Sequence, residues 1–267
     1  MNITSILSLR HLALGLAVLL AGCSAGPDPV PRLGSVTPPL FGDRNPAQFA
    51  ERTPASYAVH GIDVARFQDS IDWVAAREAG VNFAFIKATE GGDRRDVMFD
   101  DHWNGALSAG VARGAYHFYY FCTSPEDQAR WFIANVPKTP GDLPPVLDME
   151  WNPFSPTCAH RRPPADVVQD EMRRFLTLVT AHYGQRPIIY TTPKFYRENE
   201  LSDFEGYEFW LRSTARTPEQ VYTGKPWRFW QYSSTGIVPG AGGDIDLNAF
   251  SGSADDWQAW LARRTQS

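Results

Sequence analysis

Apolar runs that alternate with helical segments give the chain a repeating strand–helix pattern from about residue 58 onward. Runs rich in Val, Ile, Phe and Tyr have the length of buried strands, and they cover residues 57–64, 81–88, 112–121, 144–150, 186–192, 207–212, 227–232 and 244–250. Apolar spacing of three and four residues predicts helices between the first five strands and after the last one, at 70–80, 98–110, 124–136, 164–183 and 254–264.

Helix-ending glycines connect three of the helices to the strands that follow them. Gly80, Gly110 and Gly184 each stand at the end of a helical pattern and just before an apolar run, where a glycine tolerates the left-handed conformation that ends a helix. At the start of the first helix, Ser70 is the expected N-cap. Ile71, Val74 and Ala75 form its expected inward face.

The series of strand candidates and helices favours an α/β fold in the form of a closed β/α barrel. A doubly wound open sheet is the alternative. No G-x-G-x-x-G or Walker loop follows any of the strands, which argues against nucleotide binding.

Several predicted strands carry acids where they meet the mouth of such a barrel. Asp63 closes the first strand, Asp148 and Glu150 close the fourth, and Asp244 and Asp246 lie on the last. In a β/α barrel, functional side chains lie at the carboxyl ends of the strands.

Alternation along the fourth strand gives its two acids a direction. Val146, Asp148 and Glu150 share one face of the strand, whereas Leu147 and Met149 share the apolar face expected to meet the helices. The acids therefore point into the barrel mouth, where burial and a like charge raise the pKa of one of them and suit it to proton donation. A polar strand end that merely meets water is the competing interpretation.

Eight short motifs, in order, then resemble glycoside hydrolase family 25, the lysozymes with muramidase activity. They are HGIDVARFQ, FAFIKATEG, GAYHFYY, PPVLDMEW, PIIYTT, FWLR, WQYSSTG and IDLNAF, spread over residues 58–250. The resemblance implies a TIM-like barrel of eight strands with fewer than eight helices. It also implies cleavage of the β-1,4 bond between N-acetylmuramic acid and N-acetylglucosamine in peptidoglycan, without a metal or organic cofactor.

The same resemblance assigns roles to the acids. Glu150 matches the general acid/base, and Asp148 matches the partner that orients or polarises the N-acetyl group of the sugar, a nucleophile being its other candidate role. Asp63 and Asp246 match supporting acids of the cleft. Asp244, two residues earlier, takes the place of Asp246 if the register of the last strand is shifted.

Four further positions match or neighbour cleft positions of the family: Tyr119, Tyr190, Trp210 and Gln231. Simple packing inside the barrel is the alternative for these side chains. Lys87 and Glu90 are expected to form an ion pair, and His117 to be a hydrogen-bonded wall residue.

The N-terminus has the pattern of an export signal and not of a folded domain. A short apolar run ends in Leu20–Cys23, which resembles the lipobox of bacterial lipoproteins, in which the cysteine is lipidated. Residues 1–23 are therefore expected to be a lipoprotein signal peptide, with an ordinary cleaved signal as the alternative. The proline-rich segment 24–57 is expected to be an extended tether, and 58–267 the catalytic barrel.

Charge and cysteine content narrow the setting further. The net charge is −5 and the chain has no block of Lys and Arg, so nucleic acid is not an expected partner. A monomer anchored in the cell envelope is expected, in the outer membrane or periplasm if the cell is Gram-negative. After export, Cys122 and Cys158 are expected to form a disulfide, with two unpaired thiols as the alternative.

Three other functions compete with the muramidase. A glycan-binding protein on an inactive barrel is opposed by the presence of all four matched acids. A chitin-directed glycosidase would carry the D-x-x-D-x-D-x-E run, of which PPVLDME supplies only the last two acids. A metal-dependent deacetylase would need histidine spacings that the chain lacks.

The long insertion at 152–166 is expected to shape one side of the cleft.

Overall fold

The computed structural model describes residues 1, 35–50, 52–155 and 157–264. Apart from Met1, the expected signal peptide with Cys23 and the first part of the tether, residues 24–34, lie outside the described residues.

Eight strands form a closed barrel in the order β2-β3-β5-β6-β7-β8-β9-β10, with β10 returning to β2. The strands are β2 (His60–Val64), β3 (Phe83–Glu90), β5 (Ala112–Phe118), β6 (Val146–Met149), β7 (Ile188–Thr191), β8 (Phe209–Arg212), β9 (Phe229–Ile237) and β10 (Ile245–Phe250). Two-residue strands, β1 (Gly42–Asp43) and β4 (Arg94–Arg95), pair with β9 and β3 outside this ring. The closed barrel confirms the predicted fold and excludes the open sheet.

One strand of the ring runs against the others. Strands β2 to β9 are parallel around the barrel, whereas β10 pairs antiparallel with both β9 and β2. A hairpin can therefore join β9 to β10 where a parallel strand would need a crossover helix. This is one reason why the barrel has fewer helices than strands, as predicted.

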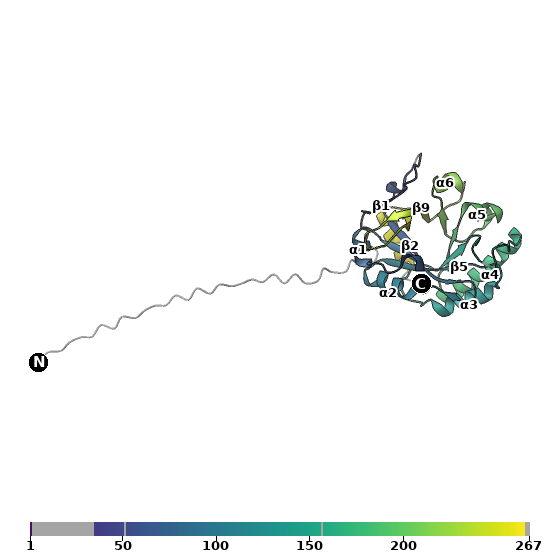
Figure 1. The fold of residues 1–267 in the computed structure, drawn as a ribbon, viewed down its shortest axis with the longest axis horizontal. Coiled ribbons are helices and arrows are strands. Elements are labelled where there is room, and N and C mark those ends of the chain that lie inside the picture. Colours follow the sequence, from purple (N-terminus) through teal and green to yellow (C-terminus); the bar gives the residue numbers. More distant parts are fainter. Residues whose placement is uncertain (2–34, 51, 156, 265–267) are drawn as a thin grey trace.

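Seven α-helices belong to the described part of the chain, and α2, α3 and α4 lie along the outside of the ring in Figure 1. They are α1 (Trp73–Glu78), α2 (Phe99–Ser108), α3 (Pro125–Asn135), α4 (Ala165–Tyr183), α5 (Pro193–Glu198), α6 (Pro218–Val221) and α7 (Ala254–Arg264). Short 3-10 helices occur at Pro54–Ser56, Arg66–Gln68 and Leu201–Asp203. Within the described ranges, none of the helices has the length and apolar character needed to cross a membrane.

The start of α1 differs from the prediction. Asp72, and not Ser70, is the N-cap: its side chain accepts hydrogen bonds from the backbone N–H groups of Val74 and Ala75. The helix begins two residues later than expected, because the Asp72 carboxylate accepts hydrogen bonds from the free N–H groups of the first turn. Val74 is consequently 59% exposed, and Trp73 is buried.

Two apolar layers hold the barrel together. The outer layer, between strands and helices, includes Leu147 and Met149 of β6, and the interior includes Val146 of the same strand. The interior is filled largely by aromatic rings, and Gly61 makes room for one of them. A Cβ on Gly61 would lie 2.3 Å from the carbonyl oxygen of Phe83 and 2.6 Å from its ring.

Helix α7 closes the end of the barrel opposite the acids. Its Trp257 packs against Phe83, Phe229 and Phe250, which lie at the starts of β3 and β9 and at the end of the antiparallel β10. Because rings fill that end, the large cavity that the strand ends line lies at the carboxyl ends of the parallel strands.

The expected tether over 24–57 does not extend to residue 57. From Ser35 on, the described residues lie against the barrel: β1 pairs with β9, and Phe41 and Phe49 pack on the outer core. The guanidinium of Arg77, which is 2% exposed, donates to the backbone and side-chain oxygens of Ser35 at 2.7 Å each. These contacts join residues that are far apart in the sequence, so no local pattern of apolar residues indicates them. The prediction of a tether up to residue 57 therefore rested on the proline content alone.

Candidate active site

The four predicted acids line one cavity of about 580 Å³ at the open end of the barrel. Asp63 lies near the end of β2, Asp148 near the end of β6, and Glu150 one residue after β6. Because Leu147 and Met149 belong to the outer layer, the alternation of β6 turns Asp148 and Glu150 inward, as the sequence indicated.

Asp246 lines the same cavity from the start of a strand, whereas the other three acids lie near or just after strand ends. It lies at the second position of β10 and not at the strand's carboxyl end. Since β10 is antiparallel, its beginning meets the carboxyl ends of its neighbours, and Asp246 stands directly opposite Asp63 in the ladder. Asp244 lies outside the cavity in an ion pair with Arg44 at 3.0 Å, with exposed side chains, so Asp246 is the cleft acid.

Asp63 is fixed by two buried amides. Gln231 and Asn248 both donate to its Oδ2 at 2.8 Å. Each amide is oriented in turn by an aromatic residue: the Tyr190 hydroxyl donates to Gln231 at 2.9 Å, and the Trp210 indole donates to Asn248 at 2.7 Å. The network determines where the Asp63 carboxylate points.

Three of the four predicted cleft positions line the cavity, and Tyr119 does not. Tyr190, Trp210 and Gln231 belong to its wall. Tyr119 faces the helices, where its hydroxyl donates to Glu171 on α4 at 2.9 Å and its ring packs against Phe175.

The chain around Tyr119 is aromatic on both faces, so alternation alone did not identify the inward residues. Tyr116, Phe118 and Tyr120 are the residues that line the cavity there.

Four basic residues line the cavity: Arg66, Lys87, Arg94 and Arg212. Lys87 forms the expected ion pair with Glu90, at 2.6 Å between Nζ and Oε2, and both line the cavity. Arg212, at the end of β8, also lines it. The sequence prediction omitted Arg212, although it lies two residues after Trp210 and therefore shares its inward face.

Burial dominates the electrostatics of the acids. It raises the pKa of Asp63 to about 6 against the opposing hydrogen bonds from Asn248 and Gln231, and it raises the pKa of Glu150 to about 7 against the charges of Arg212 and Lys87. The pKa of Asp246 rises to about 8 through burial and the charge of Asp63. Burial and the neighbouring Glu150 raise the pKa of Asp148 well above its ordinary value.

Asp148 also retains an unused acceptor. It is 6% exposed, and its Oδ1 has no hydrogen-bond partner among the described residues. A buried carboxyl oxygen without a partner is unfavourable in the free protein. A ligand N–H or O–H donor in the cavity would satisfy it.

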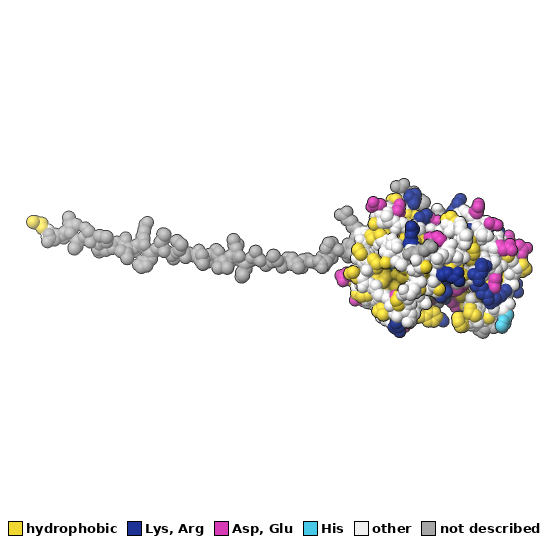
Figure 2. All heavy atoms as spheres, turned by 90° about the horizontal axis from the view of Figure 1, so that it is seen from above, with side chains coloured by type: hydrophobic (Ala, Val, Ile, Leu, Met, Phe, Trp, Pro, Cys, Tyr) yellow, Lys and Arg dark blue, Asp and Glu magenta, His cyan; other side chains and the backbone are white. Residues whose placement is uncertain are grey.

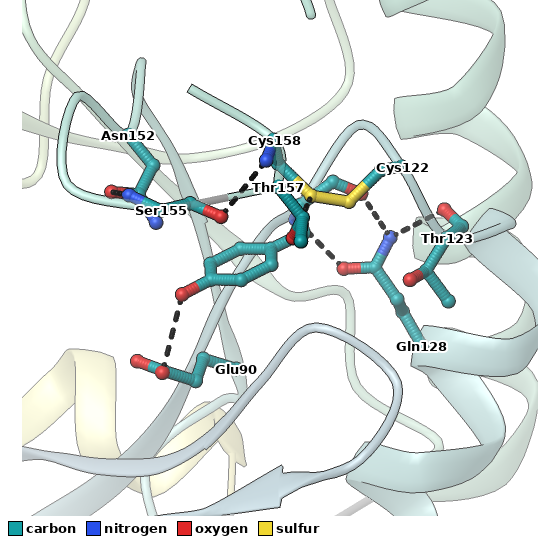
Figure 3. Close-up of a disulfide and its surroundings, with 9 residues drawn as sticks. Glu90, Cys122, Thr123, Gln128, Asn152, Ser155, Thr157 and Cys158 are labelled. Atoms are coloured by element: carbon teal, nitrogen blue, oxygen red, sulfur yellow. Dashed lines mark hydrogen bonds between the residues drawn. A yellow bond between two sulfur atoms is a disulfide. The ribbon is translucent and has the colours of Figure 1, made fainter. Parts of the chain in front are cut away.

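The loops after β5 and β6 form one wall of the cavity. Cys122 and Cys158 are joined by a disulfide between these loops, with their Cα atoms 5.7 Å apart (Figure 3). Asn152, Phe154 and Ser155 of the insertion line the cavity, as expected for that segment.

The basic end of the insertion points elsewhere. Arg162 stacks over the ring of Trp151 at 5.0 Å, and Arg161 and Arg162 do not line the cavity.

His117 is the hydrogen-bonded wall residue that the sequence suggested. Its ring nitrogens contact Thr89 at 2.8 Å and Gln128 at 3.1 Å.

A closed β/α barrel that gathers carboxyl groups, basic side chains and aromatic rings at its open end has the arrangement of a glycoside hydrolase. One carboxyl with a raised pKa can donate a proton to a glycosidic oxygen, and a second can stabilise the positive charge that develops on the sugar.

Comparison with known proteins agrees with this class. The model described as Glycosyl hydrolases family 25 matches residues 62–241. Lysozyme M1 of Streptomyces globisporus is 38% identical over 209 residues, which are 73% of this chain and 69% of that protein. The chain therefore belongs to glycosyl hydrolase family 25, which confirms the family resemblance read from the motifs.

Solved structures give the same result. A family 25 glycosyl hydrolase from Bacillus anthracis is 32% identical with a TM-score of 0.72, covering 82% of this chain and 98% of that one. A bacterial lysozyme from Streptomyces coelicolor is 33% identical with a TM-score of 0.66, covering 78% and 97%.

The raised pKa values predict that stability falls as pH rises. Asp63, Glu150 and Asp246 titrate at about 6, 7 and 8 when folded but near 4 when unfolded. Between pH 4 and 8 the folded state therefore binds more protons, and the free energy of unfolding decreases with pH. Replacing Asp246 by Asn should raise the free energy of unfolding at pH 8 by at least about 1 kcal/mol.

Denaturant unfolding of the wild type and of Asp246→Asn at pH 5 and pH 8 measures this difference. Asp244→Asn is the matched control, because its exposed ion pair should be worth less than about 1 kcal/mol at either pH. Equal stabilities of wild type and Asp246→Asn at pH 8 would contradict the account of the buried acids.

Proposed function

We propose that the chain hydrolyses peptidoglycan at the β-1,4 bond between N-acetylmuramic acid and N-acetylglucosamine, as a monomer and with Glu150 as general acid/base. The single observation that carries the proposal is the pairing of Asp148 and Glu150 in the mouth of a family 25 barrel. Similarity to proteins named lysozyme, from Streptomyces globisporus and Streptomyces coelicolor, supports the choice of substrate.

Glu150 is suited to deliver the proton. Burial raises its pKa to about 7, so a large fraction of the groups are protonated at neutral pH. The proton passes to the glycosidic oxygen as the bond to the anomeric carbon breaks. The released carboxylate then accepts a proton from the water that completes hydrolysis, and Glu150 returns to its starting state.

Asp148 is suited to handle the N-acetyl group of the sugar. Its partnerless Oδ1 can accept a hydrogen bond from the acetamido N–H, and such a bond favours the ionised carboxyl. The acetamido oxygen is then turned toward the anomeric carbon and forms a bond to it as the leaving group departs. Water attacks from the opposite side to that oxygen, so the configuration is retained.

The other acids and amides position the sugar and balance charge. Asp63, held by Gln231 and Asn248, offers a fixed acceptor to sugar hydroxyl groups. Asp246 beside it adds a second acceptor, while Arg212 and Lys87 lower the pKa of Glu150 and keep it near neutrality.

Glu150→Gln should lower kcat on purified peptidoglycan by about 10²- to 10⁴-fold, because the amide has no proton to donate at neutral pH. Binding to sedimented peptidoglycan should persist, since Gln keeps the size and the polar character of the side chain. Release of new reducing ends measures the rate.

Glu205→Gln makes the same chemical change at an exposed position outside the cavity and should leave the rate unchanged. A Glu150→Gln protein that kept more than a tenth of the wild-type rate would show that another group donates the proton.

We also propose that the protein is exported and held at a cell-envelope membrane by a lipid on Cys23. The apolar run ending in Leu20–Cys23 supports this proposal. Because the described residues contact the barrel from Ser35 on, residues 24–34 would connect the lipid to the barrel, and eleven residues span at most roughly 40 Å.

Cys23→Ala should move the protein from the membrane fraction to the soluble fraction of its host cells, because the thiol that would carry the lipid is gone. Ser24→Ala is the neighbouring control and should remain in the membrane fraction. Equal membrane association of Cys23→Ala and wild type, judged by immunoblot of the two fractions, would reject the anchor.

A further inference from the structure

A second cavity adjoins the cleft beyond the loop that follows β5. It measures about 680 Å³, and Arg94, Tyr120 and Ser155 line both cavities. No catalytic acid belongs to its wall. A substrate bound over the acids could therefore extend a side branch into this space, which we call the side groove.

The wall between cleft and side groove is rigidly built. The Gln128 side chain is fully buried: its amide nitrogen donates to the carbonyl oxygens of Tyr120 and Thr123, and its oxygen accepts from the Tyr120 N–H, each at 2.8 Å. The disulfide ties the same loop to the turn after β6, where the N–H of Cys158 donates to Ser155 (Figure 3). The side groove is thus formed before a ligand arrives.

The outer wall of the side groove is equally fixed. Trp131 on α3 donates its indole N–H to the carbonyl oxygen of Arg94 at 3.0 Å, which joins the helix to β4. The Tyr120 hydroxyl donates to Glu90 at 3.2 Å, and Glu90 is the partner of Lys87 in the catalytic cleft. The side groove and the cleft therefore share one hydrogen-bond network.

Charges of both signs surround the side groove. Arg94 and Arg130 are exposed and stand beside Asp93 and Asp127. Arg130 pairs with Asp127 at the surface, where an ion pair contributes little stability and competes weakly with a ligand. Arg94 is exposed and pairs with the largely buried Glu90 at 3.5 Å. Basic and acidic side chains also neighbour one another on the wider surface (Figure 2), so recognition of a charged ligand has to be local.

We propose that the side groove binds the short peptide stem that peptidoglycan carries on N-acetylmuramic acid. This inference rests on the proposed function, since the stem hangs from the sugar whose bond is cleaved. The stem carries free carboxylates that suit Arg94 and Arg130, and its diamino residue carries an ammonium group that suits Asp93. The Trp131 ring supplies an apolar surface for its alanine methyl groups.

Arg130→Gln tests the side groove, because Arg130 lines it and does not line the catalytic cavity. Glycan strands with intact stems are compared with the same strands after an amidase has removed the stems. Wild type should show a higher kcat/KM on stemmed strands, and Arg130→Gln should lose about three- to tenfold on them, with no change on stripped strands. Arg263→Gln, an exposed arginine on α7, is the matched control.

Several outcomes would overturn the inference. Equal wild-type kcat/KM on both substrates would do so, as would a loss in Arg130→Gln that is the same on stemmed and stripped strands. An equal loss in Arg263→Gln would assign the effect to net charge. If wild type cleaves neither substrate, the proposed function fails separately, and direct binding decides the inference.

Direct binding uses the Glu150→Gln protein and the free tripeptide of alanine, γ-linked glutamate and a diamino acid. Nitrogen-edited NMR should show a concentration-dependent shift of the Trp131 indole signal, assigned through Trp131→Phe. The shift should weaken in Arg130→Gln. An unmoved Trp131 signal at millimolar peptide would reject the side groove as a stem site.

Discussion

The two hydrogen bonds that Gln231 and Asn248 donate to Asp63 fix the position of this buried carboxylate in the cavity. Asp63 shares the cavity with three other carboxyl groups, of which Asp148 is buried and Glu150 and Asp246 are half-buried. Burial of a charge without partners is strongly unfavourable. The amides partly offset that cost, and Tyr190 and Trp210 orient them. The remaining cost of burial appears as raised pKa values of Asp63, Glu150 and Asp246. The raised pKa of Glu150 is the basis of its proposed role as proton donor.

The aromatic interior is what makes this arrangement stable. Trp210 packs against Phe85 and Tyr190 at ring distances of 4.5 Å, and it also holds Asn248. The same ring therefore belongs to the apolar core and to the polar network. Trp257 and Trp260 of α7 belong to the same interior cluster and fill the other end of the barrel. The apolar core therefore packs directly beneath the acids.

Sequence patterns predicted the site best where a strand has one polar and one apolar face. The contrast between Leu147 and Met149 on one side and Asp148 on the other fixed the direction of β6. The prediction that Tyr119 lines the cleft was wrong, because its neighbours are aromatic on both faces of the strand. The sequence there has no difference between a polar and an apolar face that would show which side chains point inward.

Long-range geometry set the limits of prediction elsewhere. Asp246 lies at a strand start, and only the antiparallel course of β10, a property of the closed ring, brings it beside Asp63. Ser35 and β1 attach to the barrel through contacts with distant residues such as Arg77, which no local pattern records. Arg212 was within reach of the sequence, because Trp210 two residues earlier was already assigned inward.

The cleaved bond is identified most directly by the new reducing end that appears after residues 24–267 have digested purified peptidoglycan. Borohydride reduction followed by sugar analysis distinguishes the two candidates. We expect N-acetylmuramic acid to be reduced, because its anomeric carbon would lie between Asp148 and Glu150. Reduction of N-acetylglucosamine alone, or of neither sugar, would contradict it.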